Sequence, residues 1–218
     1  MIRIIQVDLL YCVIEWAKRG IVGRGVLIDY LRYAEASGLS YDPWSETAIS
    51  VSTVNKIAES CNIEFQPGDI LLLRTGFIRK YQSLSEEELQ KRMDVQDMTY
   101  PGLQGSLESL EWLWDTQFAC VAADSPGFEV WSECHFLIIL PYVYELSMIH
   151  SGGGLGSMDM RMHETILSGF GMPIGELFDL EELSEQCARE KRWTFMFTSE
   201  VLNVPGGVAS PPNALAIL

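Results

Sequence analysis

Short apolar runs alternate along the chain with segments whose apolar residues recur at helical spacing. Three of these runs, at residues 25–29, 70–74 and 118–123, are apolar almost throughout and end in charged or turn residues. A continuous apolar run of this length predicts a strand that is buried on both faces of a sheet. We therefore expect an α/β or mixed α+β domain with helices packed against the sheet.

The helical pattern occurs four times. Residues 52–60 place Val54, Ile57 and Ala58 on one face of a predicted helix. A capping-box pattern, Ser85 followed by Glu88, predicts a short charged helix over residues 86–93. Further helices are predicted over residues 105–116, where Leu107, Leu110, Leu113 and Trp114 mark the apolar face, and over residues 180–191. Two more strands are predicted at residues 193–198 and, as an edge strand after Pro211-Pro212, 214–218.

Residues 134–160 interrupt this alternation and are expected to form an irregular insert. The insert contains the glycine-rich segment 151–157, which we interpret as a flexible loop because no Gly-Lys-Ser/Thr follows it. The apolar stretch 135–149 contains Pro141 and Glu145 and is shorter than the roughly 18 residues of a membrane span. Because the amino terminus also lacks a signal-peptide cleavage pattern, we expect a cytoplasmic protein without membrane contact.

Composition narrows the function classes. The 218 residues carry 15 basic and 30 acidic side chains, a formal net charge of −15, and 48% of them are hydrophobic. This hydrophobic content excludes intrinsic disorder. The negative charge argues against nucleic acid as a partner, since phosphate binding needs a basic surface. We expect a single domain over residues 1–218 that acts on a small-molecule substrate.

The five cysteines are widely spaced and contain no C-x-x-C pair, which argues against a zinc ribbon or a thioredoxin-type site. Cys120, inside an apolar run, is interpreted as a buried small side chain in a reducing compartment. A cysteine nucleophile has little support, because no cysteine stands beside a histidine base in the sequence.

His163 and Glu176 are the strongest candidate site residues. His163 stands where a helix begins, and Glu176 follows 13 residues later. An imidazole and a carboxylate at the two ends of a helix-turn-strand can converge on one divalent metal or one proton-transfer path. The alternative is that His163 is a helix-terminal hydrogen-bonding residue and Glu176 a solvated carboxylate. His135 and His150 are interpreted as partly buried or loop imidazoles.

Three carboxylates follow predicted strands, where α/β sheets place active-site groups: Asp29, Asp124 and Glu129. Helix capping and turn formation explain Asp29 and Asp124 equally well. Glu129 is a candidate for a supporting position beside a site. The chain contains neither G-x-S-x-G nor H-E-x-x-H, which disfavours a serine hydrolase of the α/β-hydrolase type and a zincin.

Five segments in order resemble the cyclase family that includes the bacterial-type kynurenine formamidases. These are residues 20–29 (GIVGRGVLID), 67–76 (PGDILLLRTG), 100–103 (YPGL), 122–126 (AADSP) and 202–214 (LNVPGGVASPPNA). The resemblance implies a swivelling β/β/α-type domain that forms homo-oligomers. It also implies metal-dependent hydrolysis of an amide, with N-formylkynurenine as the best-known substrate and zinc or manganese as the metal. His163 and Glu176 match the family's late histidine and glutamate, which implies metal ligation or proton transfer.

The family's metal motif, H-x-G-T-H-x-D, does not occur in this chain, and no histidine precedes Gly20. We expect a domain that is truncated at its amino terminus relative to the family, in preference to a site completed by a partner subunit. Two functions remain open at this point. One is an arylformamidase-like hydrolase whose catalytic site is incomplete, and the other is a catalytically inactive scaffold or oligomerisation module with the same fold.

Overall fold

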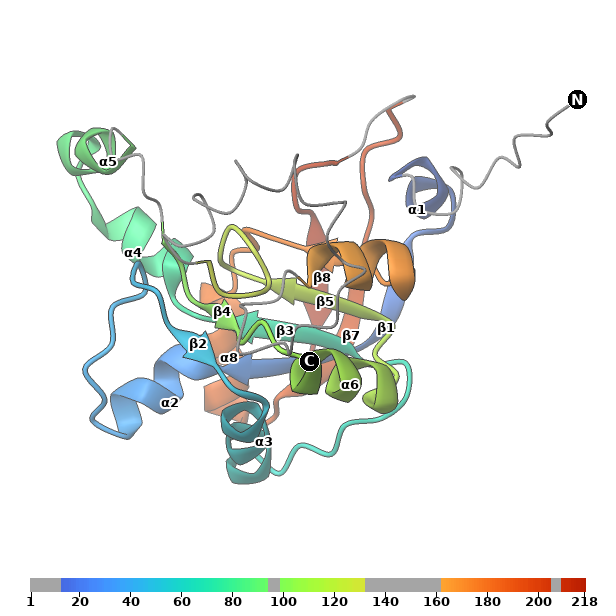
Figure 1. Ribbon diagram of the computed structural model, residues 1–218, viewed down its shortest axis with the longest axis horizontal. Coiled ribbons are helices and arrows are strands. Elements are labelled where there is room, and N and C mark those ends of the chain that lie inside the picture. The colour runs from blue at the N-terminus through green and yellow to red at the C-terminus, as the bar shows by residue number, and fades with distance from the viewer. Residues whose placement is uncertain (1–12, 94–98, 132–161, 205–208) are drawn as a thin grey trace, which may run out of the picture.

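A six-stranded sheet forms the centre of the molecule, in the strand order β6-β5-β3-β1-β7-β8 (Figure 1). The computed structural model describes residues 13–93, 99–131, 162–204 and 209–218. The strands of the sheet are Ile21–Asp29 (β1), Ile70–Arg74 (β3), Cys120–Ala123 (β5), Ile174–Gly175 (β6), Thr194–Ser199 (β7) and Ala214–Ile217 (β8). Two short parallel strands, Ala48–Ile49 (β2) and Gly102–Leu103 (β4), pair separately.

The sheet has a parallel half and an antiparallel half. β1, β3, β5 and β6 pair in parallel, whereas β7 pairs antiparallel with both β1 and β8. The three apolar runs of the sequence therefore form neighbouring strands, and their carboxyl ends lie at one edge of the parallel half. Residues 214–218 were predicted as an edge strand, and β8 occupies that position.

Helices cover both faces of the parallel half. The helical elements are Val13–Arg19 (α1), Tyr30–Ala36 (α2), Val51–Ser60 (α3), Phe77–Ser83 (α4), Glu86–Met93 (α5), Leu107–Thr116 (α6), the π-helix Thr165–Gly169 (η1) and Glu181–Glu190 (α8). α3 and α6 pack on one face and α8 packs on the other, while α4 and α5 extend away from the sheet (Figure 1). The chain is thus a mixed α+β fold, as predicted.

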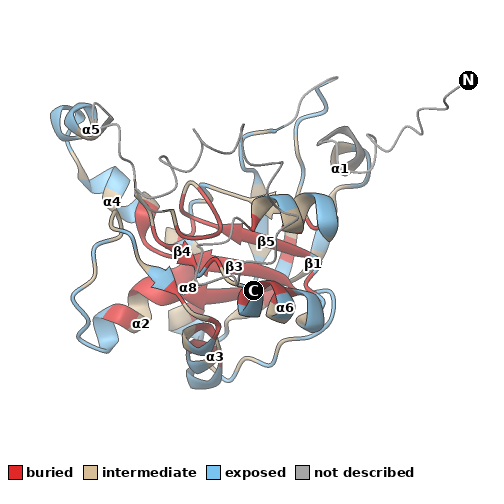
Figure 2. Ribbon diagram, in the orientation of Figure 1, coloured by how far each residue is buried: buried red, intermediate tan, exposed pale blue. Residues whose placement is uncertain are grey.

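Alternation along each strand divides the buried side chains between two cores. Leu71 and Leu73 of β3 belong to the core shared with α3 and α6, whereas Ile70 and Leu72 belong to the core shared with α8. β3 and β5, at the centre of Figure 2, are accordingly buried throughout. In the antiparallel half no described helix covers one face, and its apolar side chains are half-exposed or more: Val22, Met196, Leu215 and Ile217.

Local capping explains where the helices begin. Ser50 and Ser106 accept hydrogen bonds from backbone N–H groups three residues later, at the starts of α3 and α6. The predicted Ser85–Glu88 capping box is confirmed, with the Ser85 N–H donating to Glu88 Oε2 at 2.9 Å. The predicted apolar face of α6 is only half right. Leu110 and Leu113 are buried, whereas Leu107 and Trp114 are more than half exposed, because they lie at the two ends of the helix.

Several predictions concern segments outside the described residues. The irregular insert 134–160 lies entirely outside them, and with it the glycine-rich loop, His135 and His150. Residues 1–10 also lie outside them. Across the segments that are described, none of the helices combines the length and apolar character that a bilayer crossing requires.

Candidate active site

Three side chains from separate segments meet beside the carboxyl ends of β5 and β6. His163 Nδ1 lies 2.6 and 2.7 Å from the two carboxylate oxygens of Glu129, and His163 Nε2 lies 2.9 Å from Glu176 Oε1. The imidazole is therefore held between two carboxylates. His163 and Glu176, the two predicted site residues, are in direct contact. Glu129 contacts the other ring nitrogen of His163, Nδ1. Their chemical role stays a prediction.

The fold explains why these residues converge. Glu176 directly follows β6, whose parallel register with β5 pairs Ala122 with Gly175 and so sets Glu176 level with Ala123, the last residue of β5. Glu129 lies on the loop after β5. His163 begins the helical turn that continues as η1, and its neighbours Met162 and Ile166 anchor that turn in the core. Ligand sites in parallel sheets commonly lie at this edge.

The environment favours the charged imidazole. The hydrogen bond to Glu129, followed by the one to Glu176, raises the pKa of His163 to about 10, although partial burial opposes this. Burial alone would raise the pKa of Glu129, but its hydrogen bonds and charge interaction with His163 outweigh burial and lower it. Near neutral pH this raised pKa favours the imidazolium form of His163.

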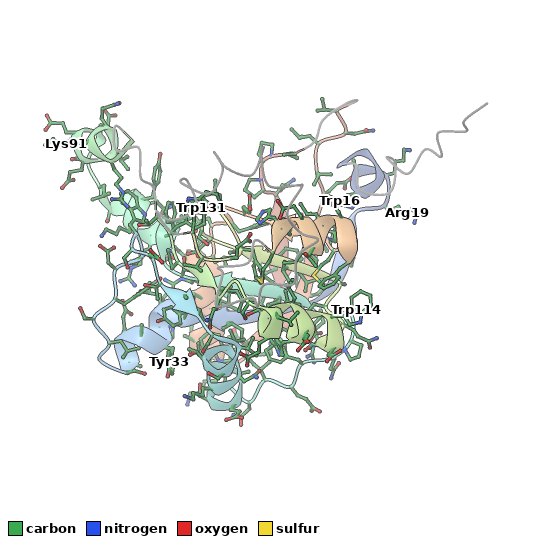
Figure 3. All side chains as sticks on the ribbon, in the orientation of Figure 1. Trp16, Arg19, Tyr33, Lys91, Trp114 and Trp131 are labelled. Atoms are coloured by element: carbon green, nitrogen blue, oxygen red, sulfur yellow. The ribbon has the colours of Figure 1, made fainter. Side chains whose placement is uncertain are left out.

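A cavity of about 430 Å³ opens on this group. His163 and Glu176 line it, whereas the side chain of Glu129 is buried behind the imidazole. Its walls are largely apolar, with aromatic rings from Phe178, Phe197 and Trp16, the last on α1 and labelled in Figure 3. Most small-molecule sites combine apolar walls of this kind with a few convergent polar groups.

The arrangement supplies a proton donor and a proton acceptor side by side. In the imidazolium form, His163 Nε2 has a proton that it can release toward a group in the cavity, and the neighbouring Glu176 side chain, 36% exposed, offers an acceptor oxygen. A 2.9 Å hydrogen bond joins the two, so that a proton can return from Glu176 to His163. Such a pair suits general acid–base catalysis.

The described residues do not by themselves complete the predicted zinc or manganese site. Both ring nitrogens of His163 already face carboxylates, and a metal would have to displace the proton on Nε2. His163 and Glu176 offer two donors, whereas protein metal sites use three or four. Among the residues that the structure describes, no group of three or more His, Cys, Asp or Glu side chains is arranged to hold a metal ion. Metal ligation by this pair stays a prediction.

Asp29 and Asp124, the other strand-end carboxylates, serve the fold. Asp29 caps α2 by accepting a hydrogen bond from the Arg32 N–H. Asp124 accepts hydrogen bonds from the backbone N–H groups of Thr75 and Gly76 and from the Thr75 hydroxyl, and so fixes the turn before α4. Burial raises the pKa of Asp124 to about 6, although these hydrogen bonds act in the opposite direction. The capping interpretation of both residues fits these contacts.

Arg74 is an important residue that the sequence reasoning missed. Its guanidinium, 2% exposed, donates to Asp29 Oδ1 at 2.8 Å and to both carboxylate oxygens of Glu181 at 2.8 and 2.6 Å. The sequence contains a signal for this role, because Arg74 is a charged residue at the end of an apolar run. In the structure it lies opposite Asp29 in the parallel register. Buried arginines need such partners.

The described thiols are unsuited to nucleophilic catalysis. Burial raises the pKa of both Cys120 and Cys187 to about 12, so neither is a thiolate near neutral pH. Cys120 and Cys187 are buried, and the third described thiol, Cys61, is partly exposed. None of the three forms a disulfide. The interpretation of Cys120 as a buried small side chain is confirmed.

A family model described as "Putative cyclase" matches residues 12–130, more than half of the chain. The match includes Glu129 and ends before His163 and Glu176. A search of curated proteins gives no significant match.

Three solved structures extend the similarity over nearly the whole chain. A structure described as a novel cyclase is 26% identical to this chain, with a TM-score of 0.70. The match covers 94% of this chain and 56% of the cyclase chain. An isatin hydrolase bound to the product analogue thioisatinate is 14% identical (TM-score 0.58; 91% and 60% covered). Isatin hydrolase A from Labrenzia aggregata, bound to benzyl benzoate, is 16% identical (TM-score 0.59; 96% and 67% covered). The chain thus spans a little over half to two thirds of the length of these proteins, and the two isatin hydrolases show the shared fold alone.

Proposed function

Since the chain belongs to this cyclase family, we propose that it hydrolyses the amide of a small aromatic molecule, in the manner of an arylformamidase. N-formylkynurenine, which would give kynurenine and formate as in tryptophan catabolism, is the proposed substrate. The observation that carries the proposal is the imidazolium of His163, held between Glu129 and Glu176 at the wall of an apolar cavity with aromatic rings.

The chain's own residues define the proposed steps. Glu176 accepts a proton from the water that adds to the formyl carbon. His163 donates its Nε2 proton to the departing aryl nitrogen, so that the C=O bond re-forms, the C–N bond breaks and a neutral amine leaves together with formic acid, which ionises to formate in water. The proton on Glu176 then returns to His163 along their hydrogen bond. Glu129 keeps the imidazole oriented and favours its charged form.

The aromatic walls support an aryl substrate. Phe178, Phe197 and Trp16 contribute flat apolar surface, which suits the ring of an anilide. The cavity volume of about 430 Å³ falls within the range typical of sites for small organic ligands.

The test is an assay of the purified chain on N-formylkynurenine, with isatin as a cyclic amide for comparison. We expect hydrolysis that falls about 10²–10⁴-fold in His163→Gln and in Glu176→Gln, the usual contribution of a general acid or base. Glu59→Gln is the matched control, because it removes an exposed carboxylate on α3, away from the cavity, and should leave the rate unchanged. Equal rates in all four proteins would contradict the proposal.

The second candidate is an inactive scaffold with the same fold. The observation that favours it is the two-donor set at His163 and Glu176, which is smaller than a metal-dependent hydrolase needs. A folded wild-type chain that hydrolyses neither substrate, with or without added zinc or manganese, would favour the scaffold. Metal-stimulated hydrolysis that a chelator abolishes would exclude it.

A further inference from the structure

The segment of residues 100–103, Tyr-Pro-Gly-Leu, runs beside the loop that carries Glu129. Leu103 N–H donates to the Phe128 carbonyl and Val130 N–H donates to the Leu103 carbonyl, both at 2.9 Å. These two hydrogen bonds hold the residues immediately before and after Glu129, Phe128 and Val130. Phe128 and Leu103 are fully buried, so the pairing lies in the core.

A second pair of hydrogen bonds ties the other end of the segment to the same loop. Trp131 N–H donates to the Tyr100 carbonyl at 3.0 Å, and Tyr100 N–H donates to the Trp131 carbonyl at 3.3 Å. The two rings stack at a centroid distance of 6.1 Å. The segment is therefore joined to the Glu129 loop at both of its ends.

The segment is itself fixed to the body of the fold. Gly102 and Leu103 form β4, which pairs in parallel register with Ala48 and Ile49 of β2. Gln104 N–H adds a 2.8 Å hydrogen bond to the Ile49 carbonyl. The segment thus connects the Glu129 loop to the strand that leads into α3.

Two glycines make the approach this close. A Cβ atom on Gly102 would lie 2.4 Å from the carbonyl carbon of Glu129 and 2.6 Å from its oxygen, which is backbone and cannot turn aside. A Cβ atom on Gly127 would lie 2.7 Å from the Tyr100 hydroxyl. Close backbone approach is a specific use of glycine. Residue 102 therefore determines how near the Glu129 backbone can come.

We propose that residues 100–103 are the positioning element of the candidate site, and that Gly102 holds the Glu129 carboxylate in contact with His163. Gly102 is a positioning residue, because the part of Glu129 that it approaches is the backbone and not the carboxylate. Any larger residue would push Glu129 away from the imidazole. The 2.6 Å distance between His163 Nδ1 and Glu129 Oε1 would then increase. The inference about activity rests on the proposed function, whereas the inference about geometry does not.

The test substitutes Gly102→Ala and follows the Nδ1–H proton of His163 by NMR, with the signal assigned by its absence in His163→Gln. A short hydrogen bond to a carboxylate gives this proton a strongly deshielded, slowly exchanging signal. We expect Gly102→Ala to lose that signal and, if the proposed function holds, to lower hydrolysis at least tenfold, since misplacement by about 1 Å can cost as much as 10²-fold.

Gly25→Ala is the matched control. Its added Cβ would lie 2.3 Å from the Phe195 ring, a clash of similar size in the core beside α8. It should lower the unfolding temperature and keep the His163 signal, which separates positioning from general destabilisation. If Gly102→Ala does not fold, Gly127→Ala tests the same element more gently, because its clash is with a side-chain end, and Gly127→Ala/Tyr100→Ala should restore the signal.

Two results would overturn the proposal: a folded Gly102→Ala protein that keeps the signal, or loss of the signal in Gly25→Ala as well. Absence of hydrolysis in the wild-type chain would instead contradict the proposed function and leave the NMR result to decide on the positioning element.

Discussion

Two clusters in this molecule share one arrangement, a cation held between two carboxylates. In one, the Arg74 guanidinium lies between Asp29 and Glu181, and in the other the His163 imidazole lies between Glu129 and Glu176. Each joins the edge of the parallel half to a later segment of the chain. They differ in exposure, because the Arg74 side chain is 2% exposed and that of His163 is 37% exposed.

The difference in cation and exposure assigns each cluster its role. A guanidinium does not release its proton in proteins, so the buried Arg74 cluster can only hold the chain together. An imidazole can release and regain a proton, and the His163 cluster opens on a cavity where a substrate can meet it. The same pattern of charges thus stabilises the fold in one place and offers proton transfer in the other.

The largest expected effect comes from removing the buried cation. Arg74→Met should lower the free energy of unfolding by about 3–5 kcal/mol, because it leaves Asp29 buried without its main partner. Urea denaturation followed by circular dichroism measures this. Arg79→Met is the control, since its ion pair with Glu35 is exposed on both sides and such pairs contribute about 0–1 kcal/mol. Similar losses in the two variants would contradict the assigned role of Arg74.

The two carboxylates of the His163 cluster should differ in strength. Glu129 is the main cause of the raised pKa of His163, so Glu129→Gln should lower that pKa by about 1–3 pH units, and Glu176→Gln should lower it less. Histidine NMR titration of the two variants provides the comparison. A larger decrease in Glu176→Gln would show that the charged imidazole depends mainly on the cavity side.

The His163 cluster should make stability depend on pH in a defined window. Its folded pKa, about 10, exceeds the unfolded value near 6.5, so its contribution is full below pH 6.5 and is lost as pH rises through 10. Between these limits the unfolding temperature of the wild type should fall more steeply than that of His163→Gln. Parallel curves for the two proteins would contradict a raised pKa of His163.

Metal binding should show the smallest effect. With two donors and a proton to displace from Nε2, His163 and Glu176 should bind zinc only weakly, and any binding should release a proton and disappear in His163→Gln. Calorimetric titration with zinc in two buffers of different ionisation enthalpy detects both. Tight stoichiometric binding at neutral pH would show that further donors complete a metal site around this pair.

Much of the fold was predictable because it depends on local pattern. The runs at 25–29 and 70–74 became neighbouring strands, and the Ser85–Glu88 box capped its helix, since burial and capping act over a few residues. The open face of the antiparallel half was not predictable in this way. Met196 and Ile217 look like core residues in sequence, and only the sheet order leaves their face uncovered.

The candidate site was predictable in its parts more than in its geometry. His163 and Glu176 stood out by residue type, position and family resemblance. The direct contact of His163 with Glu176 depends on the register of β5 with β6, which no local pattern encodes. In the sequence Gly102 is only one residue of a segment that resembles the family, because its close approach to the Glu129 backbone depends on the tertiary fold. Homo-oligomers, a cytoplasmic location and the single-domain assignment stay predictions.

The central claim is that two carboxylates hold His163 as an imidazolium at the wall of the cavity. The most direct measurement is the NMR titration of His163 in the wild-type chain, assigned with His163→Gln, from pH 5 to the alkaline limit of folding. We expect the His163 ring to remain protonated well above pH 8 and to release its proton near pH 10. Titration near pH 6.5, the ordinary value for a histidine, would contradict it.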